Sequence, residues 1–336
     1  MSKYKKKIFI ISGIICAVGA IFMALAMLTV NFDVKALDLC GDPQQVSKSY
    51  DVRDVKAISV KLYNSDIAVK KSSDDKIHVT YYTTDCCSTI STINQDKEMT
   101  LYDDFWDYGI KQYTKGFFHG YKRHGLEIVI ELPENSNINI KIDISNGSIT
   151  AENINVNTAE ISTLNGSLQF SDIISDSFCG NTTNGSVIAD KITAGSMSLG
   201  TSNGDIMVSA LTADKIGTST SNGSITVKNI NAKSTEMNTS NGEISLSDIK
   251  SEKLINASTS NGTVSIKDIS SDNIILQTSN GSILGNIIGN SDDYCISSST
   301  SNGNDSLAIY NNKNKNSNKK IEAYTSNGDI LVEFTK

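Results

Sequence analysis

The side chains that could do chemistry are few and scattered. The three histidines, His78, His119 and His124, all lie within residues 51–143, and no paired cysteines or carboxylates accompany them at the spacing of a zinc site. The sequence contains no G-x-S-x-G nucleophile elbow, no H-E-x-x-H motif and no phosphate-binding loop before a helix. We therefore expect surface histidines, and we predict no catalytic residue, no metal site and no cofactor.

The acidic residues follow a repeat rather than forming a patch. Asp172, Asp248 and Asp268 occupy equivalent places in a repeating unit, and Asn153 and Asn229 occupy the same place in other units. Because Asp alternates with Asn there, the pattern indicates a turn-forming side chain rather than a need for charge. Some parallel β-helices cleave polysaccharides with clustered carboxylates, so a polysaccharide-degrading enzyme is a minor alternative.

Cysteine usage and net charge argue against two further classes. The cysteines stand at positions 16, 40, 86, 87, 179 and 295, and they show neither a disulfide framework nor paired C-x-x-C motifs, so we expect free thiols. The formal net charge of -7 argues against binding to nucleic acid.

One repeat dominates the rest of the chain. The dipeptide Asn-Gly recurs in steps of 19 residues that lengthen to 22 and 25 near the C-terminus. Its asparagines are Asn146, Asn165, Asn184, Asn203, Asn222, Asn241, Asn261, Asn280, Asn302 and Asn327. Stacked repeats would let each asparagine bond to the one above and below it, so we predict a structural turn ladder. The Thr-Ser pairs before the asparagines are expected to form hydroxyl ladders in the same way.

Two aliphatic columns indicate how the repeats fold. The third residue after each asparagine is aliphatic, as in Ile149, Leu168 and Val187, and so is the eighth. The fifth residue is mostly apolar too, which gives the period of two of a strand. A third apolar group recurs less regularly near the fifteenth position, so we expect three short strands per turn and a roughly triangular coil. β-Hairpins are the rival use of Asn-Gly, but they would need antiparallel partners of matched length.

The predicted fold is therefore all-β. Residues 144–336 are expected to form a single-stranded parallel β-solenoid, or β-helix, of about ten 19-residue coils. Late coils lengthen by insertion, and residues 311–320 are expected to form a polar, solvated loop. No helix follows the last strand, so the C-terminal edge is expected to be bare, which favours end-to-end self-association.

The N-terminus has the pattern of a membrane anchor. Residues 1–7 contain four lysines, and residues 8–30 contain no charge. We predict a cytoplasmic basic segment at 1–7, a transmembrane helix at 8–30 and a linker at 31–50. The protein would then cross the cell membrane once, with its N-terminus inside and the solenoid outside. A cleaved signal peptide is the alternative, because Ala24-Leu25-Ala26 resembles a cleavage site.

Residues 51–143 are expected to form a β-rich N-terminal cap that shields the edge of the first coil. An insertion at residues 102–125 interrupts the cap and holds many bulky aromatics. It either packs over the cap or forms a contact loop for lipid headgroups or a ligand. The candidate contact residues are Phe105, Trp106, Tyr108, Phe117, Phe118 and Tyr121.

These features together resemble a known bacterial family. The Ser-Asn-Gly-x-Ile units from Ser145 onward, the strand that ends in Leu132-Pro133 before them and the N-terminal anchor are similar to an adhesin-like domain of unknown function. The resemblance covers roughly residues 52–336. It implies a cell-envelope β-solenoid, often tethered to the membrane, and it brings no catalytic residues with it.

We therefore expect a protein that is not an enzyme. The favoured interpretation is a cell-surface, adhesin-like binding or scaffold protein, which presents polar columns to a glycan or protein ligand. The alternative is a cell-envelope stress-sensing or regulatory scaffold. It would act through a membrane partner, because the predicted inside segment is too short for a signalling domain.

Overall fold

The computed structural model describes residues 12–13, 15–22, 24–25, 28, 43–84, 87–104, 126–134 and 136–336. Contacts divide the chain into two compact units. One comprises Met1–Gln44, Thr83–Ser88 and Asp104–Arg123, and the other comprises Gln45–Tyr82, Thr89–Asp103 and His124–Lys336. No helix among the described residues combines the length and the hydropathy needed to cross a membrane. The predicted span at 8–30 lies partly outside those residues.

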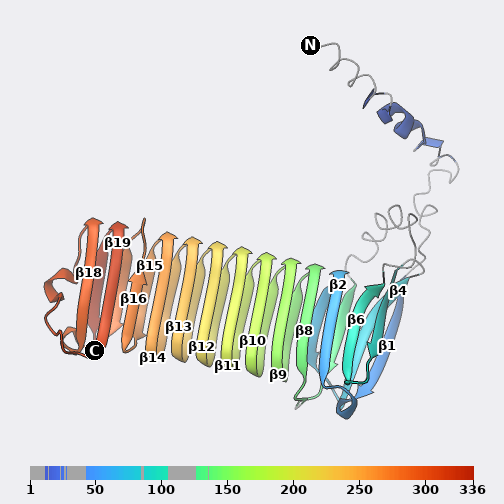
Figure 1. Ribbon diagram of the computed structural model, residues 1–336, viewed down its shortest axis with the longest axis horizontal. Helices are drawn as coiled ribbons and strands as arrows, with labels where there is room; N and C mark the ends of the chain where they lie inside the picture. Colours follow the sequence, from blue (N-terminus) through green and yellow to red (C-terminus); the bar gives the residue numbers. More distant parts are fainter. Residues whose placement is uncertain are drawn as a thin grey trace. The chain divides into compact units, whose positions relative to one another are not determined.

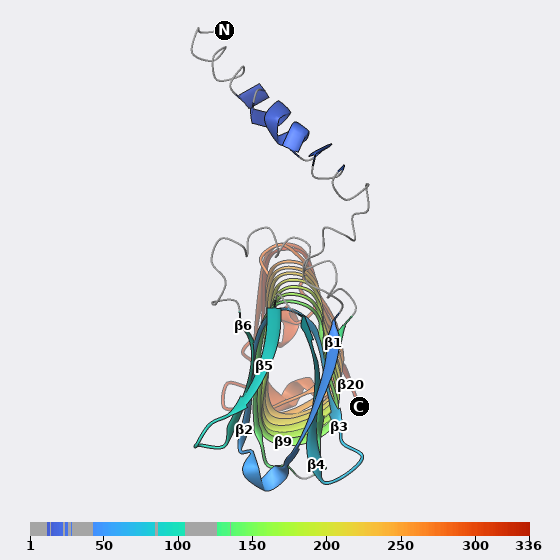
Figure 2. The same ribbon diagram turned by 90° about the vertical axis from the view of Figure 1, so that its right-hand side faces the viewer.

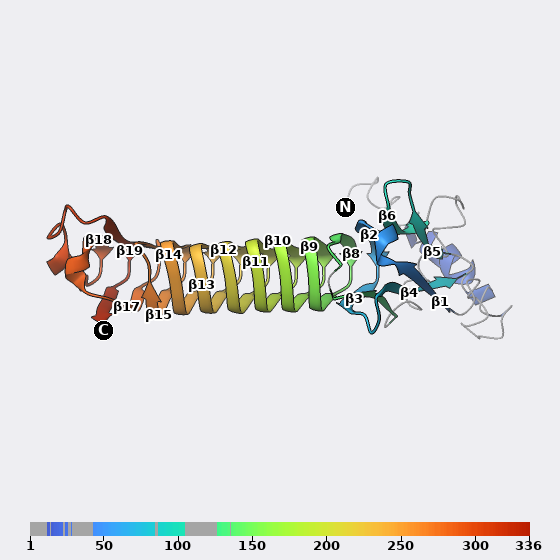
Figure 3. The ribbon, with the colours of Figure 1, turned by 90° about the horizontal axis from the view of Figure 1, so that it is seen from below.

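Six long strands form the middle of the second unit, and consecutive strands pair in parallel (Figures 1 and 3). They are β9 (Ile149–Asn165), β10 (Leu168–Asn184), β11 (Val187–Asn203), β12 (Ile206–Asn222), β13 (Ile225–Asn241) and β14 (Ile244–Asn261). Ile149 lies opposite Leu168, and Leu168 lies opposite Val187. The predicted parallel stacking of the repeats is therefore confirmed.

The core runs along the inside of this stack. Ile149, Leu168 and Val187 are fully buried, and the residues two places further along each strand are buried as well. Burial of one such aliphatic side chain contributes about 1.5–3 kcal/mol. In β10 the fifth position is Phe170, whose ring meets that of Phe178 edge to face at 4.8 Å. Because these rings fill the coil, Gly180 has no room for a side chain: a Cβ there would lie 2.6 Å from the Phe170 ring.

The coils are flatter than predicted. Each central coil is one unbroken strand of 17 or 18 residues, not three short ones, and Figure 2 shows two long sides joined by curved ends. The predicted triangular coil is therefore wrong. In the first seven repeats, the seventh residue after the asparagine provides a bend inside the strand, because its backbone is left-handed with φ between 51° and 57°. The residues at this bend are Asn153, Asp172, Lys191, Ala210, Asn229, Asp248 and Asp268.

The parallel ladder begins earlier than the predicted boundary at residue 144. The N-terminal elements are β1 (Gln44–Asp51), η2 (Val52–Asp54), β2 (Ala57–Asn64), β3 (Asp66–Lys71), β4 (Lys76–Thr84), β5 (Cys87–Ile93), β6 (Glu98–Asp104), β7 (Glu127–Leu132) and β8 (Asn139–Asn146). Strand β2 pairs in parallel with β8, and β3 with β9. The turn between β2 and β3 reads Asn64-Ser65, so it lacks the Asn-Gly signature that marks the later coils.

The outer side of this first coil is covered by further strands. Strand β6 pairs in parallel with β2, β7 pairs in parallel with β3, and β4 pairs antiparallel with β7. The change to an antiparallel partner marks the end of the regular stack, and β4 in turn pairs with β1. The N-terminal edge of the solenoid is therefore covered by residues of the chain itself.

At the other end the coils do not stack in sequence order. The elements there are β15 (Val264–Ser270), β16 (Asn273–Gln277), β17 (Ile283–Ile288), η3 (Ser291–Asp293), β18 (Tyr294–Asn302), η4 (Ala308–Tyr310), β19 (Lys319–Asn327) and β20 (Ile330–Thr335). Strand β19 pairs with both β16 and β18, and β20 pairs with β17. The last coil of the chain thus lies between two earlier ones, as Figure 1 shows for β19.

The aliphatic columns explain this insertion. Three residues after Asn327 stands Ile330, which is buried and continues the aliphatic column from Ile283 of β17. Two residues further, Val332 is buried opposite Gly285. Three residues after Asn302 stands Asp305, whose carboxylate would be costly to bury in that column without a partner. The complete coil therefore packs on β16 and β17, and the incomplete one becomes the end of the stack.

The predicted bare C-terminal edge is not what the structure shows. On the outer side of β18, the Asn311 side chain accepts from Ser298 N–H at 2.8 Å and donates to Ser298 O at 2.9 Å. Ser306 does the same for Val332 on β20, at 2.9 and 3.0 Å. Residues 311–320 are also held in place, since Asn314 and Ser317 donate to backbone carbonyls of η3. Side chains thus form hydrogen bonds with backbone groups to which an additional strand would otherwise pair.

Candidate functional site

The structure brings the ten predicted asparagines into one continuous ladder. Each Nδ2 donates to the Oδ1 of the asparagine in the neighbouring coil at 2.7–3.0 Å. The order follows the stack, so that Asn327 donates to Asn280 and Asn302 donates to Asn327. Asn64 accepts from Asn146 and begins the ladder. The sequence analysis missed Asn64, because serine follows it instead of glycine.

The glycine after each asparagine lets the turns stack closely. A Cβ on Gly223 would lie 1.9 Å from the carbonyl oxygen of Gly204, which leaves no room for any side chain. The threonine hydroxyls do not bond to one another as predicted. They donate instead to a glycine carbonyl of the adjacent coil, as Thr220 does to Gly204 O at 3.1 Å and Thr239 does to Gly223 O at 3.0 Å. The stacked Asn-Gly turns, which we call the turn column, are thus joined to one another by hydrogen bonds from coil to coil.

The candidate contact loop cannot be placed. Phe105, Trp106, Tyr108, Phe117, Phe118 and Tyr121 lie outside the described residues, as do His119 and His124. Among the residues that are described, no group of three or more His, Cys, Asp or Glu side chains is arranged to hold a metal ion. Cys179 and Cys295 are free thiols, and burial raises the pKa of the Cys179 thiol.

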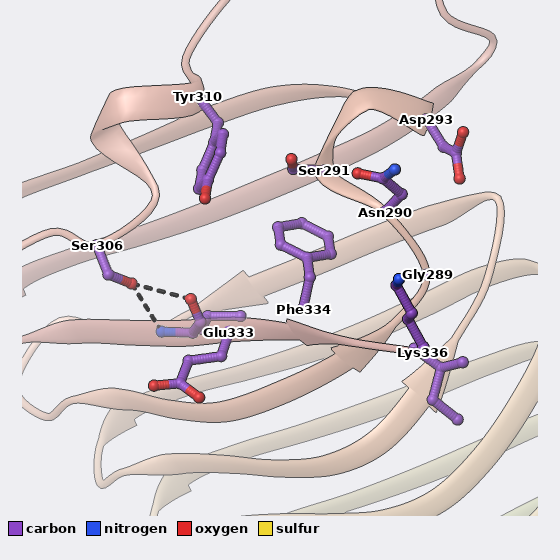
Figure 4. A pocket seen from close by; sticks show the side chains of 11 residues that line it. Gly289, Asn290, Ser291, Asp293, Ser306, Tyr310, Glu333, Phe334 and Lys336 are labelled. Atoms are coloured by element: carbon purple, nitrogen blue, oxygen red, sulfur yellow. Dashed lines mark hydrogen bonds between the residues drawn. The ribbon is translucent and has the colours of Figure 1, made fainter.

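A hollow of about 750 Å³ opens where the regular coils end (Figure 4). We call it the end groove. It is lined by Ile288, Gly289, Asn290, Ser291, Asp293, Ser306, Tyr310, Val332, Glu333, Phe334 and Lys336. These residues come from the end of β17, from η3, from the segment around η4 and from β20. The groove exists because the chain leaves the repeat twice, after β17 and after β18, and both excursions lie beside the inserted last strand.

The rings of Tyr310 and Phe334 line the end groove, and the Tyr294 ring lies behind Phe334. The Phe334 ring lies 6.0 Å from the Tyr310 ring, nearly perpendicular to it, and 6.2 Å from the Tyr294 ring. Tyr294 is buried, and its hydroxyl donates to Ser271 O at 3.1 Å. Burial raises the pKa of the Tyr294 phenol, and the nearby carboxylates Asp293 and Asp272 raise it further.

Polar groups surround these rings. Asn290, Asp293 and Glu333 place an amide and two carboxylates around the groove, and Lys336 adds an ammonium (Figure 4). Lys313 lies over the Tyr310 ring at 5.0 Å from its centroid. A concave surface with apolar rings and a few hydrogen-bonding groups is typical of sites for small polar ligands.

The end groove was missed by the sequence analysis, although two signals mark it. The Asn-Gly steps lengthen to 22 and 25 residues there, and Tyr294, Tyr310 and Phe334 gather in a repeat region that is otherwise poor in aromatics. A smaller hollow of about 260 Å³ lies over the first coils, near Lys70, Glu127 and Glu152. No aromatic side chain lines it, so it is the weaker candidate for a ligand site.

The chain is similar to several solved structures. A candidate lipid-binding protein from Parabacteroides distasonis is 16% identical, with a TM-score of 0.43 over 87% of this chain and 97% of that one. A candidate adhesin from Bacteroides fragilis is 14% identical, with a TM-score of 0.35 over 87% and 97%. A candidate cell adhesion protein from Clostridium sporogenes is 12% identical, with a TM-score of 0.17 over 88% and 100%. Likeness at this level supports no conclusion about function.

Sequence comparison is more informative. No curated protein matches the chain. The model of the Toastrack DUF4097 family matches residues 55–216 and 195–299. Together these segments span residues 55–299, more than half of the 336 residues, so the chain belongs to the Toastrack DUF4097 family.

Proposed function

We propose that this chain is a non-catalytic, adhesin-like binding module of the cell envelope, and that its end groove binds a saccharide. The observation that carries the proposal is the end groove itself, because it is the place where aromatic rings, amides and carboxylates meet in one concave surface. Aromatic rings offer apolar contact to the C–H faces of a sugar. Amide and carboxylate groups suit its hydroxyls.

The rest of the solenoid supports this proposal, because it provides a rigid scaffold for the end groove. Its asparagine side chains bond from coil to coil along the stack, and its core is continuous from Val55 to Val332. A site held on such a scaffold loses little conformational entropy when a ligand binds. Rigid presentation is what a surface-binding module needs.

Binding can be tested with purified protein and soluble fragments of bacterial cell-wall glycan, by calorimetry. Tyr310→Ala should weaken binding by roughly tenfold, as expected when one aromatic contact is lost. Tyr63→Ala is the matched control, because Tyr63 is an exposed tyrosine near the opposite end of the ladder. The proposal fails if no glycan fragment binds, or if Tyr310→Ala and Tyr63→Ala bind alike.

We also propose that residues 8–30 anchor the protein in the cell membrane, with residues 1–7 inside. The support is the uncharged run after a lysine-rich start. Fractionation of cells that produce the full chain tests this. The protein should stay with membranes after an alkaline wash, and a variant without residues 1–30 should not. Recovery of the full chain in the wash would contradict the anchor.

A further inference from the structure

The ten Asn-Gly sequences are ten copies of one chemically labile dipeptide. In such a dipeptide the backbone nitrogen of the glycine attacks the side-chain carbonyl carbon of the asparagine, and the lack of a Cβ makes the approach easy. Whether the reaction proceeds in a folded protein depends on whether that nitrogen and that side chain are free to move. The solenoid places the ten copies in nearly the same geometry, so any difference among them stands out.

Nine of the ten glycine N–H groups are held by the neighbouring coil. Each donates to the backbone oxygen of the next asparagine in the ladder at 2.9–3.1 Å, as Gly223 does to Asn241 O and Gly328 does to Asn302 O. The tenth is Gly303. Among the described residues its N–H has no acceptor, because Asn302 belongs to the last coil of the stack and no further asparagine lies beyond it.

The side chain of Asn302 is also less restrained than the others. Its Nδ2 donates to Asn327 Oδ1 at 2.8 Å, but no neighbouring asparagine donates to its own Oδ1. In every other Asn-Gly pair, the asparagine Oδ1 accepts from the next Nδ2. Gly303 is exposed as well, whereas the nine other ladder glycines are partly buried. Three features thus distinguish the pair Asn302-Gly303, and all of them accompany its place in the last coil.

We propose that Asn302-Gly303 is a site of spontaneous deamidation in the folded protein and that the stack protects the other nine pairs. The Gly303 nitrogen forms a bond to Asn302 Cγ, and the Cγ–Nδ2 bond breaks. Nδ2 leaves as ammonia with the proton from Gly303 N–H. Water then opens the resulting five-membered imide at either carbonyl, which leaves aspartate or its isoaspartyl isomer at position 302.

This modification acts on the outermost coil. The new side chain lacks the Nδ2 donor, so its carboxylate faces Asn327 Oδ1 as acceptor against acceptor. The isoaspartyl isomer also adds one carbon to the backbone in the turn. Both products weaken the contact between β18 and β19.

Peptide mapping by mass spectrometry after incubation of the full-length protein at mildly alkaline pH tests the proposal. All ten sites are read in the same sample, and the same protein in denaturant gives each site its unprotected rate. In the folded protein Asn302 should react near its unprotected rate. It should also react roughly tenfold or more faster than Asn222 or Asn241, the factor that one lost hydrogen bond gives.

Two outcomes overturn the proposal. One is that Asn302 is protected in the folded protein as strongly as Asn241. The other is that all ten sites react at their unprotected rates, which would mean that the stack protects none of them. An Asn302→Gln variant provides the control for assignment, because the signal from this peptide should disappear while the other nine rates stay unchanged.

Discussion

The central coils and the terminal coils of the solenoid share the same repeat, but only the central coils stack in the order of the sequence. From β9 to β14, each coil has both neighbours in sequence order, and every turn group is paired on both sides. From β15 to β20, the order in space departs from the order in the chain, and two excursions leave the stack. The central coils show what makes a regular rod, and the terminal coils show how a rod gains a specific surface.

The hydrogen bonds of the asparagine ladder do not determine the order in which the coils stack. Asn302 and Asn327 both fit the ladder. The third position after the asparagine distinguishes the two coils, because Ile330 continues the aliphatic column there and Asp305 does not. At the fifth position both coils bury an aliphatic side chain, Val332 in one and Leu307 in the other. Complementarity of the core therefore sets the topology, and the polar turns follow it.

The largest loss of stability is expected when a side chain is added to a glycine of the turn column. Gly223→Ala should lower the free energy of unfolding by about 3 kcal/mol or more, because the new Cβ would meet a backbone oxygen at 1.9 Å. Chemical denaturation measures this. Gly217→Ala is the control, since a Cβ there has no neighbour closer than 3.9 Å. Gly303→Ala should cost less than Gly223→Ala, because the outermost coil can shift; equal costs would show that the two regions do not differ.

The next effect concerns the asparagine ladder. Asn241→Ala removes the ladder bonds to Asn222 and from Asn261, together with a longer bond to Ser221 O, and should cost about 1–2 kcal/mol. Asn302→Ala removes only one and should cost about half as much. Thermal unfolding by circular dichroism compares them, with Ser240→Ala as a neighbouring control. An Asn302 effect as large as that of Asn241 would contradict the account of the ladder's end.

An alkaline loss of stability is expected from Tyr294 in the terminal coils. The folded state holds the Tyr294 proton more tightly than the unfolded state, because burial raises the pKa of the phenol. Stability from this group is therefore complete below the ordinary tyrosine pKa of 10.0 and is lost as pH rises above it. Tyr294→Phe should cost about 1 kcal/mol at neutral pH through the lost bond to Ser271 O, but it should reduce the alkaline loss. An unchanged alkaline profile in the variant would refute this role.

The smallest expected effect is a gain in stability rather than a loss. Ala210 adopts the left-handed backbone at the bend, where alanine is strained and glycine is not. Ala210→Gly should therefore raise stability by about 0.5–1 kcal/mol. Ala213→Gly is the matched control three residues away in the same strand, and it should lower stability by a similar amount. If both substitutions lower the melting temperature, the bend is not strained in solution.

Much of the regular region could be predicted from the sequence. The 19-residue spacing of Ile149, Leu168 and Val187 was enough for the parallel stack, and alternation of Asp with Asn was enough for the bend at the seventh position. These are local signals, repeated often enough to be unambiguous.

The terminal regions could not be predicted in the same way. The first coil turns at Asn64-Ser65, which carries no Asn-Gly signature. The insertion of β19 and β20 depends on a comparison between coils far apart in the chain, and the end groove exists only because of that insertion. Long-range packing, rather than local pattern, decides these features.

Disulfide trapping tests the order of the terminal coils most directly. In a background without the native cysteines, the pair Ile275→Cys and Glu322→Cys should form a disulfide, because these residues are register partners in adjacent strands, about 4.8 Å apart. The pair Ile275→Cys and Ser297→Cys should not, because Ser297 pairs with the far side of Glu322 and lies two coils away. Efficient bridging to position 297, with none to position 322, would mean that the coils stack in sequence order and that the end groove is not formed as described.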